Sequence, residues 1–124
     1  NQIIMKILVC EDDIIISKAI EHKLKNEGYS VDIAIDGTQA TEKVSANSYD
    51  LIMTDLLMPF LGGLELVNKV RNELKITTPI IVLSKLGNEE TIIEAFQLGA
   101  DDYIMKPFSP NELSIRVKRL LIKR

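Results

Sequence analysis

LIMTDLLMPFLGG, residues 51–63, is an apolar run that one carboxylate interrupts and that a proline and two glycines end. The pattern predicts a buried strand over residues 51–54, with Asp55 where the strand leaves its sheet and a turn-rich loop behind it. Taken alone, an aspartate in this place is typical of an Asx turn or of a helix N-cap. A chemical role for Asp55 therefore requires other charged residues nearby.

Short apolar runs recur along the chain, and a segment with helical spacing follows each of them. Further strands are expected over residues 6–10, 31–35, 79–84 and 102–105. Helical spacing covers residues 14–27, a stretch ending near Asn47, the leucines and valines of 66–74, residues 88–98, and the chain from Pro110 onward. This β-α order, repeated five times, predicts an α/β fold: a five-stranded parallel, doubly wound sheet with helices on both faces.

Composition is that of one ordinary globular domain. The chain has 124 residues, of which 46% are hydrophobic and 27% charged. The net charge of −3 provides no general attraction to nucleic acid or to an anionic membrane. Five Lys or Arg residues in 116–124 are expected to lie on a solvated or dimer face rather than to contact DNA.

Cysteine usage and the pattern of apolar stretches lead us to expect a cytoplasmic protein. The single cysteine, Cys10, excludes an internal disulfide and a cysteine metal cluster, which fits a reducing compartment. No apolar stretch reaches the roughly 18 residues of a membrane span, and the N-terminus lacks the apolar region of a signal peptide. Met5 is expected to be the native start, with residues 1–4 a remnant of cloning or a short extension.

Charged and hydroxyl residues stand at or just past the ends of four predicted strands: Glu11, Asp12 and Asp13, then Asp55, Ser84 and Lys106. In a doubly wound sheet, ligands bind beyond the carboxyl ends of the strands, and strands one and three commonly lie side by side. Asp12 and Asp55 are therefore expected within a few ångströms of each other, where they repel unless a proton or a cation intervenes. Oxygen ligands with an open side favour Mg²⁺ over zinc or a fully caged Ca²⁺.

Carboxylates around Mg²⁺, together with a lysine and a hydroxyl, can perform phosphoryl transfer. A carboxylate can itself be the nucleophile, and Asp55 is the best candidate because it is central and a loop that can approach the metal follows it. Each residue alone has an ordinary explanation: Ser84 as a turn residue, Lys106 as a solvated cation, and the acids after the first strand as helix-start residues. Their joint occurrence favours a phosphoryl site.

Four motifs resemble those of the receiver domain of two-component response regulators: ILVCEDD (7–13), TDLLMPFLGG (54–63), IIVLSK (80–85) and GADDYIMKPF (99–108). The resemblance covers residues 5–124 and implies one receiver domain with the strand order 2-1-3-4-5 of the CheY-like, flavodoxin-like fold. It implies that Asp55 accepts a phosphoryl group from a sensor histidine kinase. The domain would then change conformation to control dimerisation or a following effector domain for transcription regulation.

The resemblance also assigns roles to the other residues. Glu11, Asp12, Asp55 and the Leu57 backbone carbonyl would bind Mg²⁺, and Ser84 and Lys106 would contact the phosphoryl oxygens. Tyr103 would be the aromatic residue whose inward or outward rotamer reports the switch. The chain would thus be a signalling phosphoacceptor that promotes its own phosphorylation and slow dephosphorylation, not an enzyme acting on a separate substrate.

The end of the chain, GADDYIMKPFSPNELSIRVKRLL (99–121), is most similar to the OmpR/PhoB subfamily. That subfamily pairs through its fourth helix, fifth strand and fifth helix. Asp101, Asp102 and Arg116 match charged positions used there, and Lys123 is a conservative match.

Two positions depart from this pattern. Ile92 stands where the subfamily carries a base, which leaves Glu112 without its expected partner in the second subunit. Lys85 stands where receivers have a small residue, and it either shields the phosphate or points to water. Leucines at 57 and 86 are expected to flank the approach of the hydrolytic water, and they predict slow phosphate loss.

Two other classes of protein share parts of this pattern. A flavodoxin-like cofactor binder needs a phosphate loop rich in glycine or hydroxyl residues after the first strand, where this chain has EDD (11–13). A degenerate receiver that acts only as a docking module would lack the acceptor, the acids or the lysine. All of these are present here.

Overall fold

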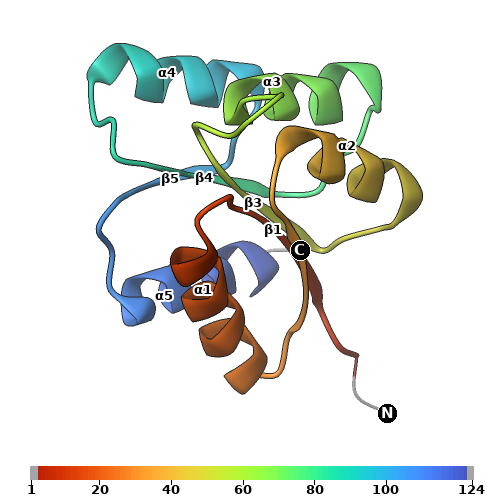
Figure 1. Ribbon diagram of the computed structural model, residues 1–124, viewed down its shortest axis with the longest axis vertical. Coiled ribbons are helices and arrows are strands. Elements are labelled where there is room, and N and C mark those ends of the chain that lie inside the picture. The colour runs from red at the N-terminus through yellow and green to blue at the C-terminus, as the bar shows by residue number, and fades with distance from the viewer. Residues whose placement is uncertain (1–2, 123–124) are drawn as a thin grey trace.

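The computed structural model describes residues 3–122, and its elements alternate between strand and helix along the chain (Figure 1). The strands are β1 (Lys6–Cys10), β2 (Ser30–Ala34), β3 (Leu51–Asp55), β4 (Ile80–Ser84) and β5 (Asp102–Met105). The helices are α1 (Ile14–Asn26), α2 (Gly37–Ala46), α3 (Gly63–Asn68) with a π-helical turn η1 (Lys69–Glu73), α4 (Glu89–Leu98) and α5 (Pro110–Ile122). The predicted elements are therefore confirmed, apart from shifts of one or two residues at their ends and the π-helical turn.

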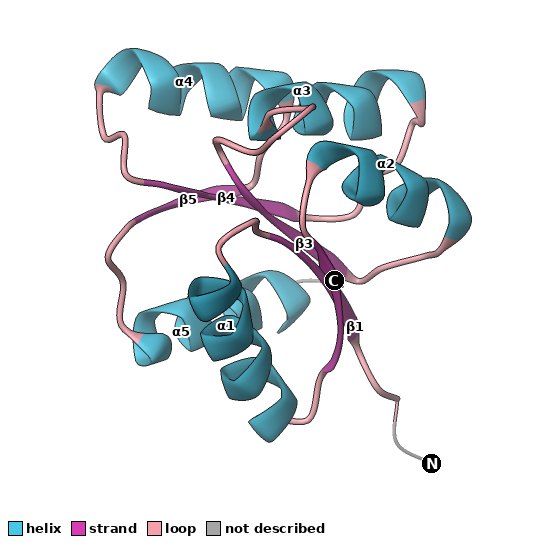
Figure 2. Cartoon of the chain, viewed as in Figure 1, coloured by secondary structure: helices cyan, strands magenta, loops and turns pink. Residues whose placement is uncertain are grey.

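All four strand pairings are parallel, and the strand order is β2-β1-β3-β4-β5, as the family resemblance implied. Helices α2, α3 and α4 cover one face of the sheet, and α1 and α5 cover the other (Figures 1 and 2). Parallel strands are joined by crossover connections, usually helices, and these connections are right-handed. Because the chain adds β2 on one side of β1 and then β3, β4 and β5 on the other, its helices lie on both faces of the sheet.

Alternate residues of the central strands bury their side chains on opposite faces. In β1, Leu8 and Cys10 belong to the core under α2, α3 and α4, while Ile7 and Val9 belong to the core under α1 and α5. All four are fully buried. This is why the strand appears in the sequence as a continuous apolar run instead of an alternating one.

Local signals set the helix ends. The side chain of Asn88 caps α4 by accepting a hydrogen bond from the Thr91 amide, as predicted, and Gly99 ends that helix with a φ of 115°. The apolar face predicted for the first helix is buried only in part, because Ala19 remains exposed. None of the helices in residues 3–122 is both long and apolar enough to cross a membrane.

The register brings the carboxyl ends of β1, β3, β4 and β5 to one edge of the sheet. Cys10 pairs with Thr54, Asp55 with Leu83, and Ser84 with Met105. The residues that follow these strand ends must therefore share one small region, and the candidate site lies there.

Candidate functional site

Three carboxylates converge at this edge, and we call the group of Glu11, Asp12 and Asp55 the acidic pocket. One oxygen from each lies within 4.8 Å of the others, which confirms the predicted convergence after β1 and β3. Glu11 is buried, Asp55 is partly buried and Asp12 is exposed. Such closely spaced oxygens, open to solvent on one side, match the donor set that Mg²⁺ prefers.

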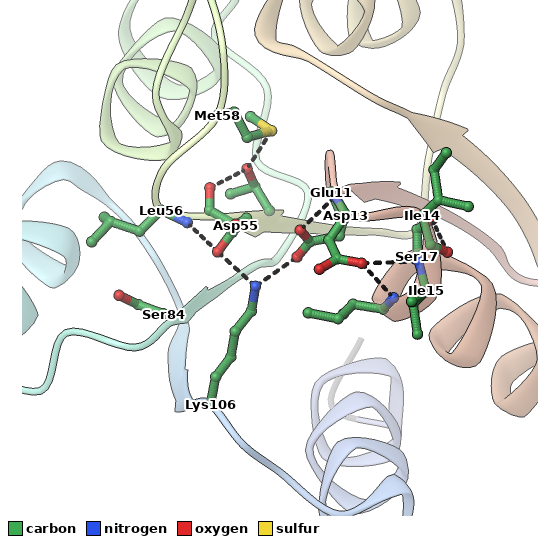
Figure 3. Close-up of polar contacts among 12 residues, drawn as sticks. Glu11, Asp13, Ile14, Ile15, Ser17, Asp55, Leu56, Met58, Ser84 and Lys106 are labelled. Atoms are coloured by element: carbon green, nitrogen blue, oxygen red, sulfur yellow. Dashed lines mark hydrogen bonds and ion pairs between the residues drawn. The ribbon is translucent and has the colours of Figure 1, made fainter.

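Lys106 provides the positive charge inside the acidic pocket. Its Nζ lies 2.8 Å from Glu11 Oε2 and 3.1 Å from Asp55 Oδ1, between the two carboxylates (Figure 3). Its side chain is only 8% exposed. Burial lowers the pKa of this amine, but hydrogen bonds to Glu11 and Asp55 and their charges outweigh burial and raise it. Lys106 is therefore a fixed cation shared by two acids.

Glu11 has the opposite balance of effects. Burial raises the pKa of this carboxyl, and the nearby Asp55 charge adds to the rise. Hydrogen bonds from Lys106 and from the Asp13 amide offset it only in part. Three carboxylates facing one lysine leave the pocket with surplus negative charge, which a divalent cation would neutralise.

The third acid of the EDD stretch has a different role. Asp13 caps α1, because its Oδ1 accepts hydrogen bonds from the amides of Ile15 and Ile16 at 2.9 and 3.2 Å. The ordinary explanation of a helix-start acid thus applies to Asp13, whereas Glu11 and Asp12 turn toward the pocket. Asp55 does not cap a helix, because the next helix, α3, begins at Gly63 and has Gly62 as its N-cap.

The loop after β3 folds back over the strand end. The Gly63 amide donates to the Leu56 carbonyl at 2.8 Å, and a Cβ at Gly63 would overlap the Asp55 carbonyl oxygen, so only glycine permits this approach. The Leu56 amide donates to Asp55 Oδ1 at 3.1 Å and orients the carboxylate. The loop also brings Leu57 to the pocket wall.

A cavity of about 420 Å³ opens above the acidic pocket, and Ser84, Lys85 and Leu86 line its β4 side. Ser84 is buried and its Oγ accepts a hydrogen bond from the Leu86 amide at 2.8 Å. The cavity is large enough for a hydrated cation and a phosphoryl group side by side. Its walls hold every residue predicted from the strand ends.

Tyr103 lies on β5, with its ring turned inward. It is buried, and its hydroxyl donates to the Leu86 carbonyl at 2.6 Å. Leu86 thus accepts from Tyr103 through its carbonyl and donates to Ser84 through its amide, which links the two residues through one peptide segment.

The residues predicted for a dimer face form contacts within the chain. Asp102 is bound by Arg116 at 2.8 Å and by Arg119 at 3.2 Å, and Arg116 also reaches Glu112 at 3.5 Å. We call these four residues the Asp102 cluster. Sequence reasoning missed Arg119, although its position one turn after Arg116 on the same helix face could have indicated it.

Other members of the predicted dimer face behave differently. Asp101 accepts from Arg71 and from the Ile80 amide, both at 2.8 Å, so it joins the end of the third helix to β4. Nothing in the motifs indicated the role of Arg71. Ile92 is partly buried against the core under α2, α3 and α4. Lys123 lies outside the described residues.

Comparisons with known proteins identify the family of this chain. The model of the "Response regulator receiver domain" family matches residues 7–118. The transcriptional regulatory protein ResD of Bacillus subtilis is 43% identical over 116 residues, which cover 94% of this chain and 48% of ResD. The response regulator ArlR of Staphylococcus saprophyticus is 40% identical, over 94% of this chain and 52% of ArlR. The chain spans about half the length of these relatives.

Solved structures show the same similarity. The receiver domain of the Francisella response regulator 1452 superposes with a TM-score of 0.91 at 40% identity, covering 96% of this chain and 98% of that one. The chemotaxis response regulator CheY4 of Vibrio cholerae has a TM-score of 0.90 at 33% identity, covering 96% and 100%. Fold and sequence similarity agree over nearly the whole length, and the chain belongs to the response regulator receiver domain family, the phosphorylation-dependent switches of two-component signalling.

Proposed function

We propose that Asp55 is the phosphoacceptor of this chain and that residues 5–124 form its receiver domain. The observation that carries the proposal is the acidic pocket itself, where Asp55 lies beside one buried cation and opens onto a cavity. The donor is a phosphohistidine of a sensor histidine kinase. Mg²⁺, held by Glu11, Asp12, Asp55 and the Leu57 carbonyl, would supply positive charge for the phosphoryl oxygens.

In the transfer, an Asp55 carboxylate oxygen attacks the phosphorus as the bond from phosphorus to the imidazole nitrogen breaks. The electron pair of that bond stays on the nitrogen, and because the other ring nitrogen already carries a proton, the imidazole leaves as a neutral ring. Lys106 already contacts Asp55 at 3.1 Å and can hold a phosphoryl oxygen after a small movement. The Ser84 oxygen accepts a hydrogen bond from the Leu86 amide, so the Ser84 hydroxyl proton is free to be donated to a phosphoryl oxygen.

The link through Leu86 provides a route for the switch. When Ser84 turns toward the phosphoryl group, its hydrogen bond to the Leu86 amide is disturbed, and so is the Tyr103 bond to the Leu86 carbonyl. Tyr103 then loses a 2.6 Å contact that holds it inward. We expect α4 and β5, which flank this segment, to present a changed surface.

Output is proposed to be transcription regulation in the cytoplasm, through an effector domain or through a phosphorylation-dependent homodimer across α4, β5 and α5. Several similar proteins are named transcriptional regulatory proteins, among them ResD and CrdR. The candidate dimer residues are Asp101, Asp102, Arg116, Lys123, Ile92 and Glu112. Because the aspartates already have partners within the chain, apolar contacts of α4, including the exposed Phe96, would supply much of the affinity. This domain is not proposed to contact DNA itself.

Phosphate loss is proposed to be slow. Leu57 and Leu86 both line the cavity beside Asp55, and neither side chain can hydrogen-bond to an attacking water. A water that no group orients rarely attains the in-line geometry that hydrolysis needs.

Intact-mass measurement after incubation with acetyl phosphate and Mg²⁺ tests the acceptor. Wild type should gain one phosphoryl group, and Asp55→Asn should gain none. Asp36→Asn is the matched control, because it makes the same chemical change at the N-cap of α2, where asparagine also caps. It should be modified like wild type, and modification of Asp55→Asn would refute the assignment.

A further inference from the structure

Lys85 lies at the boundary between two hollows of the surface. It directly follows Ser84 and lines the cavity above the acidic pocket. It also lines a neighbouring apolar groove of about 480 Å³ between α1 and the segment that begins α5, whose walls include Ile15, Ala19 and Phe108. In the described part of the chain, only Ile16, Lys85 and Lys106 line both hollows.

The two lysines at this boundary differ in their contacts. Lys106 is almost fully buried and bound to two carboxylates. Lys85 is exposed and forms no hydrogen bond or ion pair with any residue in 3–122. Its ammonium group can therefore contact an anion that approaches the pocket without breaking an existing interaction.

An approaching phosphoryl donor meets a pocket in which the protein's own acids outnumber its cations, and bound Mg²⁺ would only bring the three carboxylates and Lys106 to neutrality. Glu11, Asp12 and Asp55 lie within the pocket and Asp13 lies at its rim, while Lys106 alone opposes them from inside. A phosphoryl group is itself anionic, so one further cation at the mouth changes the approach in two ways. It raises the local concentration of the donor, and it holds the group beside Asp55.

We propose that Lys85 binds and positions the phosphoryl group of the donor, an inference that rests on the proposed function of Asp55. It contacts the transferring group by its charge and does not recognise the molecule that carries the group. The effect should therefore be present with a small acyl phosphate, which is too small to use the apolar groove. It should weaken with salt, because the ammonium is exposed.

The test compares initial rates of phosphorylation by acetyl phosphate at saturating Mg²⁺, measured by intact mass. Lys85→Met keeps most of the bulk and removes the charge, and it should lower the second-order rate about fivefold and flatten its salt dependence. Lys85→Arg should restore both. The control is Lys75→Met, an equal change of charge at an exposed lysine in the loop before β4, at the opposite edge of the sheet. It should match wild type.

Mg²⁺ titration by calorimetry separates positioning from damage to the metal site. Lys85→Met should bind Mg²⁺ about twofold more tightly, because a cation has left the neighbourhood of the ligands. Weaker binding in this variant would overturn the proposal, since the slower transfer would then come from loss of metal.

The remaining outcomes distinguish this inference from the proposed function. Wild type that is phosphorylated, with Lys85→Met equally fast or faster, would overturn the role of Lys85 alone, and a faster variant would identify the side chain as an obstruction. Wild type that takes up no phosphoryl group would overturn the proposed function and this inference with it.

Discussion

Buried carboxylates contact cations in two regions of this molecule, and the net charge of the two regions differs. In the acidic pocket one lysine is shared by two acids, and a third acid lies beside them. In the Asp102 cluster one buried acid is shared by two arginines, and Glu112 contacts Arg116, so that two carboxylates balance two arginines. The pocket keeps surplus negative charge beneath a cavity, whereas the cluster is neutral.

This difference separates a region whose charges are balanced within the chain from a region whose charges are not. A buried charge costs free energy unless a partner compensates it, so a stable cluster tends toward neutrality. The Asp102 cluster has reached neutrality with its own side chains and joins β5 to α5. Under the proposed function the acidic pocket would reach neutrality when Mg²⁺ binds, which is the property expected of a binding site.

The largest expected effect follows from removing the single cation of the acidic pocket. Lys106→Met leaves Glu11 and Asp55 facing each other, and we expect it to lower the free energy of unfolding in chelator by about 2–3 kcal/mol. Mg²⁺ should recover much of this loss and should bind more tightly than to wild type. Urea unfolding with and without Mg²⁺ measures both, with Lys75→Met as the control. Equal losses in the two buffers would mean that the pocket lacks surplus charge.

Removing the acid of the neutral cluster should have a smaller effect. Asp102→Asn leaves Arg116 and Arg119 without their carboxylate, but their side chains are 36% and 45% exposed, so water solvates much of the released charge. A loss of about 1.5 kcal/mol is expected, the same with and without Mg²⁺. Glu112→Gln, on the exposed side of the cluster, should lose less than about 0.5 kcal/mol. A strong Mg²⁺ dependence of Asp102→Asn would contradict the distinction between the two regions.

A pH titration of stability should reveal Glu11 at a smaller amplitude. Its pKa is raised in the folded state, chiefly by burial, so the folded protein binds this proton more tightly than the unfolded chain. In chelator its contribution is fully present below the usual glutamate value of 4.5 and is lost as pH rises through the folded pKa. Glu11→Gln should remove this slope, and its persistence there would assign the slope to another group.

Two other carboxyls have shifted pKa values, and both give a slope of the opposite sign. The Asp32 pKa is lowered, mainly by the hydrogen bond from Tyr49. The Glu27 pKa is also lowered, because hydrogen bonds from Ser114 and Lys23 and nearby positive charge together outweigh the effect of its burial. Both groups contribute stability above their usual values and lose it as pH falls, so their window lies below that of Glu11.

The smallest effect concerns the attack of water on the phosphorylated acidic pocket. The Asp102 cluster undergoes no such reaction. Leu57→Asn should speed loss of phosphate about fivefold, because the amide can orient the attacking water. The measurement is the decay of the phosphorylated mass after the donor is removed. Ile35→Asn, at an exposed leucine-sized side chain that does not line the cavity, should decay like wild type. If wild type decays as fast as Leu57→Asn, the leucine does not shield the phosphate.

Much of the fold and the site could be predicted because the signals are local. Strands and helices follow from runs and spacing of apolar residues, and Asn88 and Gly99 end their segments by their own conformational preferences. The π-helical turn of Lys69–Glu73 was not predicted, since a single wide turn leaves no distinct spacing in so short a segment. Arg71 was missed for a related reason: its partners Gly99 and Asp101 are distant in sequence.

The sequence by itself determined that Glu11, Asp12, Asp55, Ser84 and Lys106 would meet, because the carboxyl ends of parallel strands share one edge of a sheet. Only the tertiary structure decided how charge is shared among them. That Lys106 binds Glu11 as well as Asp55, that Asp13 and not Asp12 caps α1, and that Arg119 joins Arg116 on Asp102 all depend on strand register and side-chain rotamers. Register and rotamers are set by packing between segments far apart in the chain, which no local pattern records.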